Sequence, residues 1–316
     1  MQFRINGTQG RLALLCTVSA LTACIGDSDD GALSGVVVAP PPAVSPQDNV
    51  NISDPTLVLF DNEPVGPGDE LIQVWEEEFD GERVDPETWF FQSGDGTDEG
   101  IPGWGNNELQ YYLPDNAQVS DGMLTITARE ESTGGFNYTS ARIITRDRVA
   151  VRYGRIEARI RLPGGQGIWP AFWMLPQDTS YGGWAASGEI DIVEAVNLGG
   201  SGGNEVFGTL HYGGEAPANV FTGEAYVVPA DARAEFHTYS IEWDPTEIRW
   251  YVDGVLYAMQ NSWFSTAAPF PAPFDQPFYI ILNVAVGGNF PGPPNAITAF
   301  PVTMDVDWIR VYAGQP

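Results

Sequence analysis

Three carboxylates lie within six residues of an otherwise apolar run, Glu189-Ile-Asp-Ile-Val-Glu194. Acidic side chains in a half-buried strand repel one another and lose hydration, so this cluster points to a function. In a regular strand, side chains two residues apart share a face, which places Glu189 and Asp191 together. Glu194 lies at an odd offset, and it joins them only if a bulge adds one residue after Asp191.

Two glutamates at the ends of such a surface suit the cleavage of a glycosidic bond with retention of configuration. One ionised carboxylate attacks the anomeric carbon, and a second, protonated one delivers its proton to the leaving oxygen. A retaining pair is separated by roughly 5–5.5 Å. At that distance like charges separate the two pKa values, so the pair holds one proton. Asp191 would hydrogen-bond the nucleophile.

The spacing of the acids leaves other interpretations open. Carboxylates also bind Ca²⁺ or Mg²⁺, an acidic strand can be solvated, and a sugar-binding protein can keep the acids of a lost active site. Nearby aromatic residues favour a carbohydrate site, because flat indole rings stack on the faces of sugar rings. Tryptophans occur at 169, 173 and 184, and residues 104–112 interleave aromatic rings with amides, which both donate and accept hydrogen bonds.

The composition predicts an all-β fold. The chain of 316 residues is 43% hydrophobic and 12% aromatic, with 36 Gly and 25 Pro, which favours strands and turns over helices. Short strands with turns between them argue for a β-sandwich. We expect strands at 123–128, 155–162, 278–286 and 304–312, a hairpin around Asp253-Gly254, and one helical turn within 229–236.

The charge excludes one class of partner. All 14 basic residues are arginine, and with 42 acidic residues the formal net charge is −28. A polyanion such as nucleic acid would be repelled. We therefore expect no nucleic-acid partner, and we interpret the acidic surface as one that keeps an exported protein soluble.

The first 23 residues have the features of a signal peptide. Arg4 and Arg11 precede an apolar stretch, 12–23, that is too short to span a membrane. Residues 21–24, Leu-Thr-Ala-Cys, resemble a bacterial lipobox, which implies cleavage before Cys24 and lipidation of that residue. An ordinary signal peptide is the alternative. Cleavage would leave 12 Arg against 42 acidic residues, a charge near −30, and no second cysteine for a disulfide.

The rest of the chain divides into two parts. Residues 25–70, with prolines at 40–42 and 46, are expected to form a flexible tether, and residues 71–316 the catalytic domain. Nothing in that domain is long and apolar enough to span a membrane, so contact with a membrane would run only through the lipid at Cys24. We expect an exported protein, held in the cell envelope or on the outer surface, or otherwise secreted.

The acidic run resembles the bulged E-x-D-x-x-E signature of glycoside hydrolase family 16, and other segments resemble its laminarinase branch. The resemblance runs from about Val74 to Tyr312 in the order of the family. It implies a monomeric β-jelly-roll sandwich of two antiparallel sheets with a concave cleft, and a retaining endo-hydrolase of β-1,3-glucan. The matching segments are 104–112, 169–176, 189–194, 208–213, 283–290 and 306–312.

The resemblance also implies roles for single residues. Glu189 corresponds to the nucleophile, Glu194 to the general acid/base and Asp191 to the assisting carboxylate. Seven further residues correspond to the lining of the sugar site: Trp104, Asn106, Arg142, Trp169, Trp173, Trp184 and His211. Without the resemblance, Arg142 reads as the partner of an acid on the sheet and His211 as a structural residue.

Catalysis by two carboxylates requires no cofactor, but many relatives carry one structural Ca²⁺ far from the cleft. Its ligands are a carboxylate near the C-terminus and two backbone carbonyls, and the corresponding residues are Asp307, Glu78 and Gly122. An ordinary surface acid is the alternative interpretation of Asp307.

Two other functions remain open for the same fold. One is the hydrolysis of another algal polysaccharide (agar, porphyran or carrageenan), since relatives with those activities share the acidic signature. Sulfated substrates usually require basic residues, in which this chain is poor. The other is a non-catalytic β-glucan-binding protein, in which the acids are usually replaced. Transglycosylation of the same glucan would use the same residues as hydrolysis.

Overall fold

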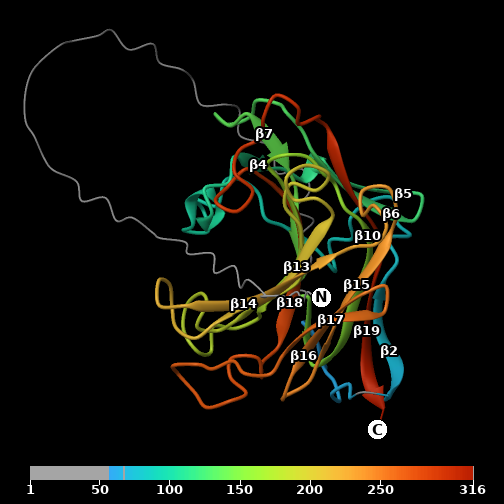
Figure 1. Ribbon diagram of the computed structural model, residues 1–316, viewed down its shortest axis with the longest axis vertical. Coiled ribbons are helices and arrows are strands. Elements are labelled where there is room, and N and C mark those ends of the chain that lie inside the picture. Colours follow the sequence, from blue (N-terminus) through green and yellow to red (C-terminus); the bar gives the residue numbers. More distant parts are fainter. Residues whose placement is uncertain (1–56, 67, 316) are drawn as a thin grey trace, which may run out of the picture. The chain divides into compact units, whose positions relative to one another are not determined.

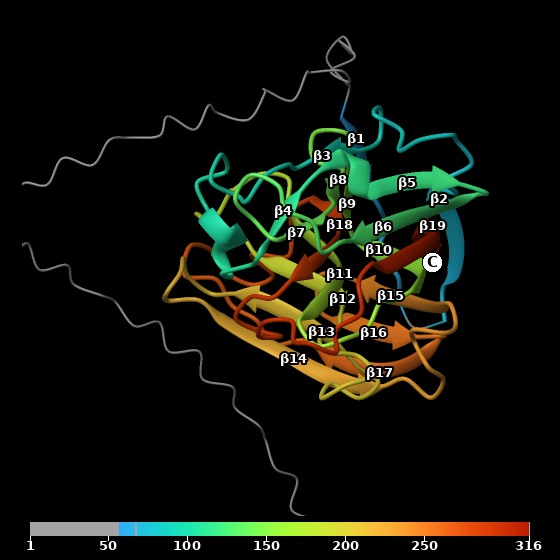
Figure 2. The ribbon, with the colours of Figure 1, turned by 90° about the horizontal axis from the view of Figure 1, so that it is seen from above.

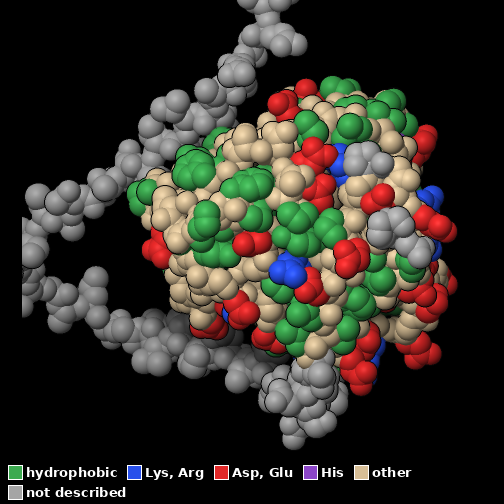
Figure 3. Space-filling model, turned by 90° about the horizontal axis from the view of Figure 1, so that it is seen from below, with side chains coloured by type: hydrophobic (Ala, Val, Ile, Leu, Met, Phe, Trp, Pro, Cys, Tyr) green, Lys and Arg blue, Asp and Glu red, His purple; other side chains and the backbone are tan. Residues whose placement is uncertain are grey.

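The computed structural model describes residues 57–66 and 68–315. The predicted signal peptide, Cys24 and the predicted tether up to residue 56 lie outside these residues. Within the described part of the chain, no helix is long and apolar enough to cross a membrane. On the face seen in Figure 3, acidic side chains far outnumber basic ones, in keeping with the net charge of −28.

Two large β-sheets stack on each other in the described part of the chain (Figures 1 and 2), so the predicted sandwich is confirmed. The nine-stranded sheet has the order β1-β9-β18-β11-β12-β13-β14, with β8 also pairing β18 and β3 pairing β8. Its strands are β1 (Val58–Asp61), β3 (Phe90–Phe91), β8 (Arg142–Ile144), β9 (Val149–Arg152), β11 (Ile168–Pro176), β12 (Glu189–Glu194), β13 (Glu205–Tyr212), β14 (Val220–Val227) and β18 (Phe278–Val286).

The eight-stranded sheet has the order β17-β16-β15-β10-β19-β6-β5, with β2 also pairing β19. Its strands are β2 (Glu70–Glu77), β5 (Ala117–Ser120), β6 (Met123–Ala128), β10 (Gly154–Arg161), β15 (His237–Trp243), β16 (Ile248–Val252), β17 (Val255–Gln260) and β19 (Val302–Gln315). A small third sheet joins β4 (Gln110–Tyr112) and β7 (Tyr138–Ser140), and two 3₁₀ turns lie at η1 (Pro102–Gly105) and η2 (Pro114–Asn116).

The core lies between the two large sheets, and alternation along the strands fills it. In β10, Ile156, Ala158 and Ile160 are fully buried between the sheets, as their period of two predicts. Every residue of β18 is buried, which confirms the prediction of a strand covered on both faces. The Asp253-Gly254 hairpin joins β16 to β17, and the other predicted strands also form.

The predicted boundary of the tether differs from the structure. Val58 to Asp61 pair in parallel with β9, so the last part of the predicted tether belongs to the sandwich. Each residue of β1 pairs with a residue 91 positions later, and such a distant parallel partner leaves no hairpin signal in the sequence. The single helical turn predicted within 229–236 is confirmed, because the amide of Glu235 donates to the carbonyl of Asp231 as in an α-turn, and the amide of Ala234 donates to the same carbonyl. The predicted antiparallel sheets therefore include this parallel pair, and β4 and β7 are also parallel.

Candidate active site

A bulge in β12 brings the three acids to one face of the nine-stranded sheet. On β13 the partners of Glu189, Asp191 and Glu194 are His211, Thr209 and Phe207 respectively, and the register shifts between Asp191 and Glu194. The register with β11 shifts in the same place. The odd offset is thereby absorbed, as the sequence predicted. The residues between the acids turn to the core, where Ile190 and Ile192 are buried.

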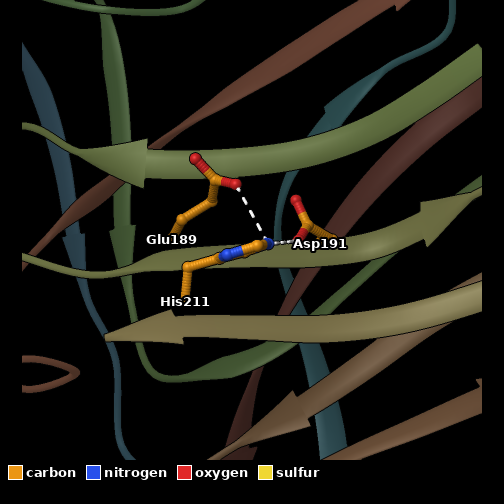
Figure 4. Close-up of side chains that lie close together, drawn as sticks. All are labelled: Glu189, Asp191 and His211. Carbon is orange, nitrogen blue, oxygen red and sulfur yellow. Dashed lines mark ion pairs between the residues drawn. The ribbon is translucent and has the colours of Figure 1, made fainter. Parts of the chain in front are cut away.

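Glu189 receives two contacts from cationic or polar donors. The indole Nε1 of Trp184 donates a 2.7 Å hydrogen bond to its Oε2, and Nε2 of His211 lies 3.5 Å from its Oε1 (Figure 4). The side chain of Glu189 is 13% exposed, whereas Trp184 is 47% exposed. An exposed indole beside a nearly buried carboxylate can contact both a sugar ring and the acid.

His211 also contacts Asp191, the middle acid of the strand. His211 Nε2 lies 3.3 Å from Oδ2 of Asp191, whose side chain is 2% exposed (Figure 4). Burial lowers the pKa of His211, but the negative charges of Glu189 and Asp191 outweigh it and raise that pKa to about 9. His211 is therefore a cation at neutral pH, which balances part of the negative charge of the acids.

Glu194 lies at the other end of the row, in a more apolar setting. The indole Nε1 of Trp169 donates a 2.9 Å hydrogen bond to its Oε1. The ring of Phe290 packs edge-on against Trp169 at 5.6 Å and against Phe207 at 5.5 Å, measured between centroids. Phe207 is also the cross-strand partner of Glu194. The indole that contacts this carboxyl group is therefore itself packed in an aromatic cluster.

Burial sets the protonation of the two glutamates. It raises the pKa of Glu189 to about 7, with a further contribution from the charge of Asp191. Burial also raises the pKa of Glu194 well above its usual value, and the charges of Asp191 and Glu189 add to this. Glu189 is the closer of the two to the His211 cation, so it ionises first. This is the division that a nucleophile and a general acid need.

Arg142 is held between two of the predicted sugar-binding tryptophans. Its guanidinium carbon lies 4.6 Å from the ring centroid of Trp104 and 4.8 Å from that of Trp173. Its Nε donates a 2.6 Å hydrogen bond to Gln92. Arg142 thus stacks between aromatic rings, and its charge also acts on the buried carboxyl group of Glu108, whose pKa it lowers.

A chain of buried polar groups behind Trp173 was not singled out from the sequence. Trp173 Nε1 donates to Asn283 Oδ1 at 2.7 Å, Asn283 Nδ2 donates to Tyr112 Oη at 3.1 Å, and Tyr112 donates to Glu108 at 3.2 Å. Asn106, a predicted site residue, donates to the other oxygen of Glu108 at 3.4 Å. Most of these residues lie in segments 104–112 and 283–290, which resemble the laminarinase branch, but their mutual contacts depend on the folded arrangement.

Glu189, Asp191 and His211 also have the distances of a metal-ligand group, with one ligand atom each lying within 4.8 Å of the others. A metal there would have to displace the proton of His211, because it binds a neutral imidazole and the charges of Glu189 and Asp191 raise the pKa of His211 to about 9. The residues predicted for Ca²⁺ lie apart from this site. Asp307 pairs with Arg159, and Glu78 Oε1 accepts a 2.7 Å hydrogen bond from Arg310, so a Ca²⁺ ion would have to displace Arg159 from Asp307. Calcium there stays a prediction.

Paired carboxylates on an aromatic face of an all-β sandwich define the site of a glycosidase. The model of the family described as glycosyl hydrolases family 16 matches residues 106–310. The chain belongs to that family, and the jelly-roll fold expected from the resemblance is confirmed.

Several characterised proteins are similar to it. The chain is 44% identical over 297 residues to glucan endo-1,3-beta-glucosidase A1 of Niallia circulans, which covers 88% of this chain and 42% of that protein. It is 43% identical over 261 residues to a beta-glucanase of Rhodothermus marinus, covering 76% and 84% respectively. The laminarinase catalytic domain of Thermotoga maritima MSB8 superimposes with a TM-score of 0.70 at 43% identity, covering 78% of this chain and all of that domain. The chain therefore spans less than half of the Niallia circulans protein.

Proposed function

We propose that this protein hydrolyses internal β-1,3-glucosidic bonds of laminarin-like glucans with retention of configuration. The observation that carries the proposal is the pair of glutamates at the two ends of the bulged strand, each receiving an indole hydrogen bond. The relatives named for endo-1,3-glucanase or laminarinase activity, at 43–44% identity, support the choice of a β-1,3-glucan.

The reaction takes place in two steps, the formation of a covalent glycosyl-enzyme and its hydrolysis. In the first, Glu189 attacks the anomeric carbon, the glycosidic C–O bond breaks, and the proton of Glu194 moves to the leaving oxygen. In the second, the now ionised Glu194 takes a proton from water, the water oxygen attacks the anomeric carbon, and Glu189 is released. Asp191 and the His211 cation remain beside Glu189 and hold its position and charge.

A galactan remains the alternative substrate, and a sulfated one fits this site less well. The cations beside the acids are Arg142 and His211, and both are engaged: Arg142 lies between two indole rings, and His211 contacts two carboxylates. A sulfate group would have to compete with these contacts for either cation. A neutral glucan needs no such partner.

The test is the release of reducing ends from laminarin, lichenan, agarose and carrageenan by the wild type. We expect the highest kcat/KM on laminarin. Glu189→Gln should abolish activity on every substrate that the wild type cleaves, and Glu194→Gln should lower it by roughly 10²- to 10⁴-fold. The matched control is Glu205→Gln, which removes an exposed carboxylate from the same sheet and should leave activity unchanged. Full glucanase activity in Glu189→Gln would overturn the proposal.

We further propose that the protein is exported as a lipoprotein and that residues beyond Cys24 tether the catalytic domain to a membrane. The support is the lipobox-like sequence at 21–24 and the apolar stretch before it. Cys24→Ser should release the protein from the membrane fraction of an expressing bacterium without a change in specific activity. Unchanged membrane association of this variant would contradict the proposal.

A further inference from the structure

An aromatic row crosses three strands and ends on the edge of the nine-stranded sheet. Glu189 on β12 pairs with His211 on β13, and His211 pairs with Phe221 on β14. The ring centroids of His211 and Phe221 lie 5.7 Å apart, and those of Trp184 and His211 are also 5.7 Å apart. Phe221 is 50% exposed, on the edge strand seen beside β17 in Figure 2.

Next to this row runs a strip of small side chains. Asp191 pairs with Thr209, and Thr209 pairs with Gly223. A Cβ atom at Gly223 would lie 2.8 Å from Thr209 Oγ1 and 2.9 Å from the Gly208 carbonyl oxygen, so this position has no room for a side chain. Ala225 follows on the same face of β14, opposite Phe207. Phe221, Gly223 and Ala225 are all exposed.

The strip of Thr209 and Gly223 runs from Asp191 to the edge of the sheet, with aromatic rings on both sides. Trp184, His211 and Phe221 lie on the Glu189 side, and Phe207 and Phe290 lie on the Glu194 side. Neighbouring strands are about 4.8 Å apart, so β14 lies roughly 10 Å from β12. That distance is beyond the sugar attacked by Glu189, yet within the length of an oligosaccharide that crosses the strands.

We propose that Phe221 and Gly223 form a distal subsite for a glucose residue of the bound chain, with the sugar ring resting on the Phe221 ring above Gly223. This inference rests on the proposed β-glucanase function and adds to it a residue that sets the preferred chain length. An exposed phenylalanine beside a position that admits no side chain presents a flat apolar surface, which suits the apolar face of a pyranose ring.

The experiment measures kcat/KM on β-1,3-gluco-oligosaccharides of increasing length. We expect Phe221→Ala to lower kcat/KM roughly three- to tenfold on the longest substrates and to leave it unchanged on the shortest ones that the wild type cleaves. Phe221→Trp, which keeps a flat ring, should retain the advantage of long substrates. Thr222→Ala, on the same strand with its side chain on the opposite face, is the matched control and should behave as the wild type.

Two results would overturn the subsite. Equal losses in Phe221→Ala at every length would mean that Phe221 acts only by positioning His211, and an unchanged length dependence would mean that it contacts no sugar. Both results can be observed only if the wild type is active, so they differ from a failure of the proposed function. If the wild type cleaved none of the β-1,3-linked substrates, the proposed function would be wrong, and the subsite proposal would fall with it.

Discussion

The indole Nε1 of Trp169 donates a 2.9 Å hydrogen bond to Oε1 of Glu194, the general acid of the proposed reaction. A hydrogen bond to a carboxylate favours its charged form, so this contact lowers a pKa that burial raises. Trp169 therefore does more than offer a ring face to the sugar: it limits how strongly Glu194 holds its proton.

Trp169→Phe tests this contact, because phenylalanine keeps an aromatic face but has no N–H. The pKa of Glu194 should rise further, so the alkaline limb of the kcat/KM profile, where the general acid loses its proton, should move up by about one pH unit. The measurement is kcat/KM on laminarin across the pH range. Trp173→Phe is the matched control: it loses a hydrogen bond to Asn283, not to Glu194, and its alkaline limb should stay in place.

His211 should control the acid limb. Its positive charge lowers the pKa of Glu189, which burial and Asp191 raise, and the net result is a pKa of about 7. Because the nucleophile must be ionised, His211→Asn should raise that pKa, move the acid limb upward by about one unit, and lower kcat/KM at pH 6 roughly tenfold. The other histidine of the chain provides the control, since His237 contacts Asp253 instead. An acid limb in His211→Asn that coincides with that of the wild type would refute the assignment.

The burial of Glu189 should also make the stability of the protein depend on pH. The pKa of Glu189 is raised from 4.5 to about 7, so the folded state holds this proton more tightly than the unfolded chain. Its contribution to stability is complete below pH 4.5 and is lost as the pH rises toward 7. Between pH 4.5 and 6.5 the raised pKa of His211 adds no change, because the folded and unfolded states both keep that proton until about pH 6.5.

Glu189→Gln has no carboxyl group at this position, so it does not lose this stability as the pH rises. From pH 4.5 to pH 6.5, the free energy of unfolding of Glu189→Gln should therefore increase by about 2 kcal/mol relative to that of the wild type. Urea denaturation at the two pH values measures the difference, with Glu205→Gln as the control for losing a carboxylate outside the site. Parallel pH dependences for Glu189→Gln and the wild type would show that Glu189 titrates normally.

Gly208 on β13 supports the site from the core side. A Cβ atom there would lie 2.4 Å from Cδ1 of Trp250 and 2.6 Å from Oη of Tyr257. The Nε1 of Trp250 donates to the backbone carbonyl of Asp191 at 2.8 Å, so displacing this indole would disturb the acidic strand. Gly208→Ala should cost about 1–3 kcal/mol in thermal or urea unfolding. Gly200→Ala, where the nearest atom is 3.4 Å away, should cost much less.

The sequence predicted the features that depend on local pattern. The apolar run at 278–286 forms β18, and the odd offset of Glu194 marks the bulge because strand periodicity fixes side-chain direction. Features that depend on distant partners left no such signal. The parallel pairing of β1 with β9 and the Asn283–Tyr112 hydrogen bond, 171 residues apart, exist only once the sheets assemble. Phe221 was missed for a similar reason: its place in the row comes from pairing, not spacing.

The central claim is retention of configuration through a covalent intermediate on Glu189, and the anomeric form of the first product tests it most directly. Proton NMR during the first minutes of laminarin hydrolysis, before mutarotation equilibrates the ends, distinguishes the two anomers. Two displacements at the same carbon, the first by Glu189 and the second by water, predict that the β-anomer appears first. Initial release of the α-anomer would mean a single direct attack by water and would contradict the account.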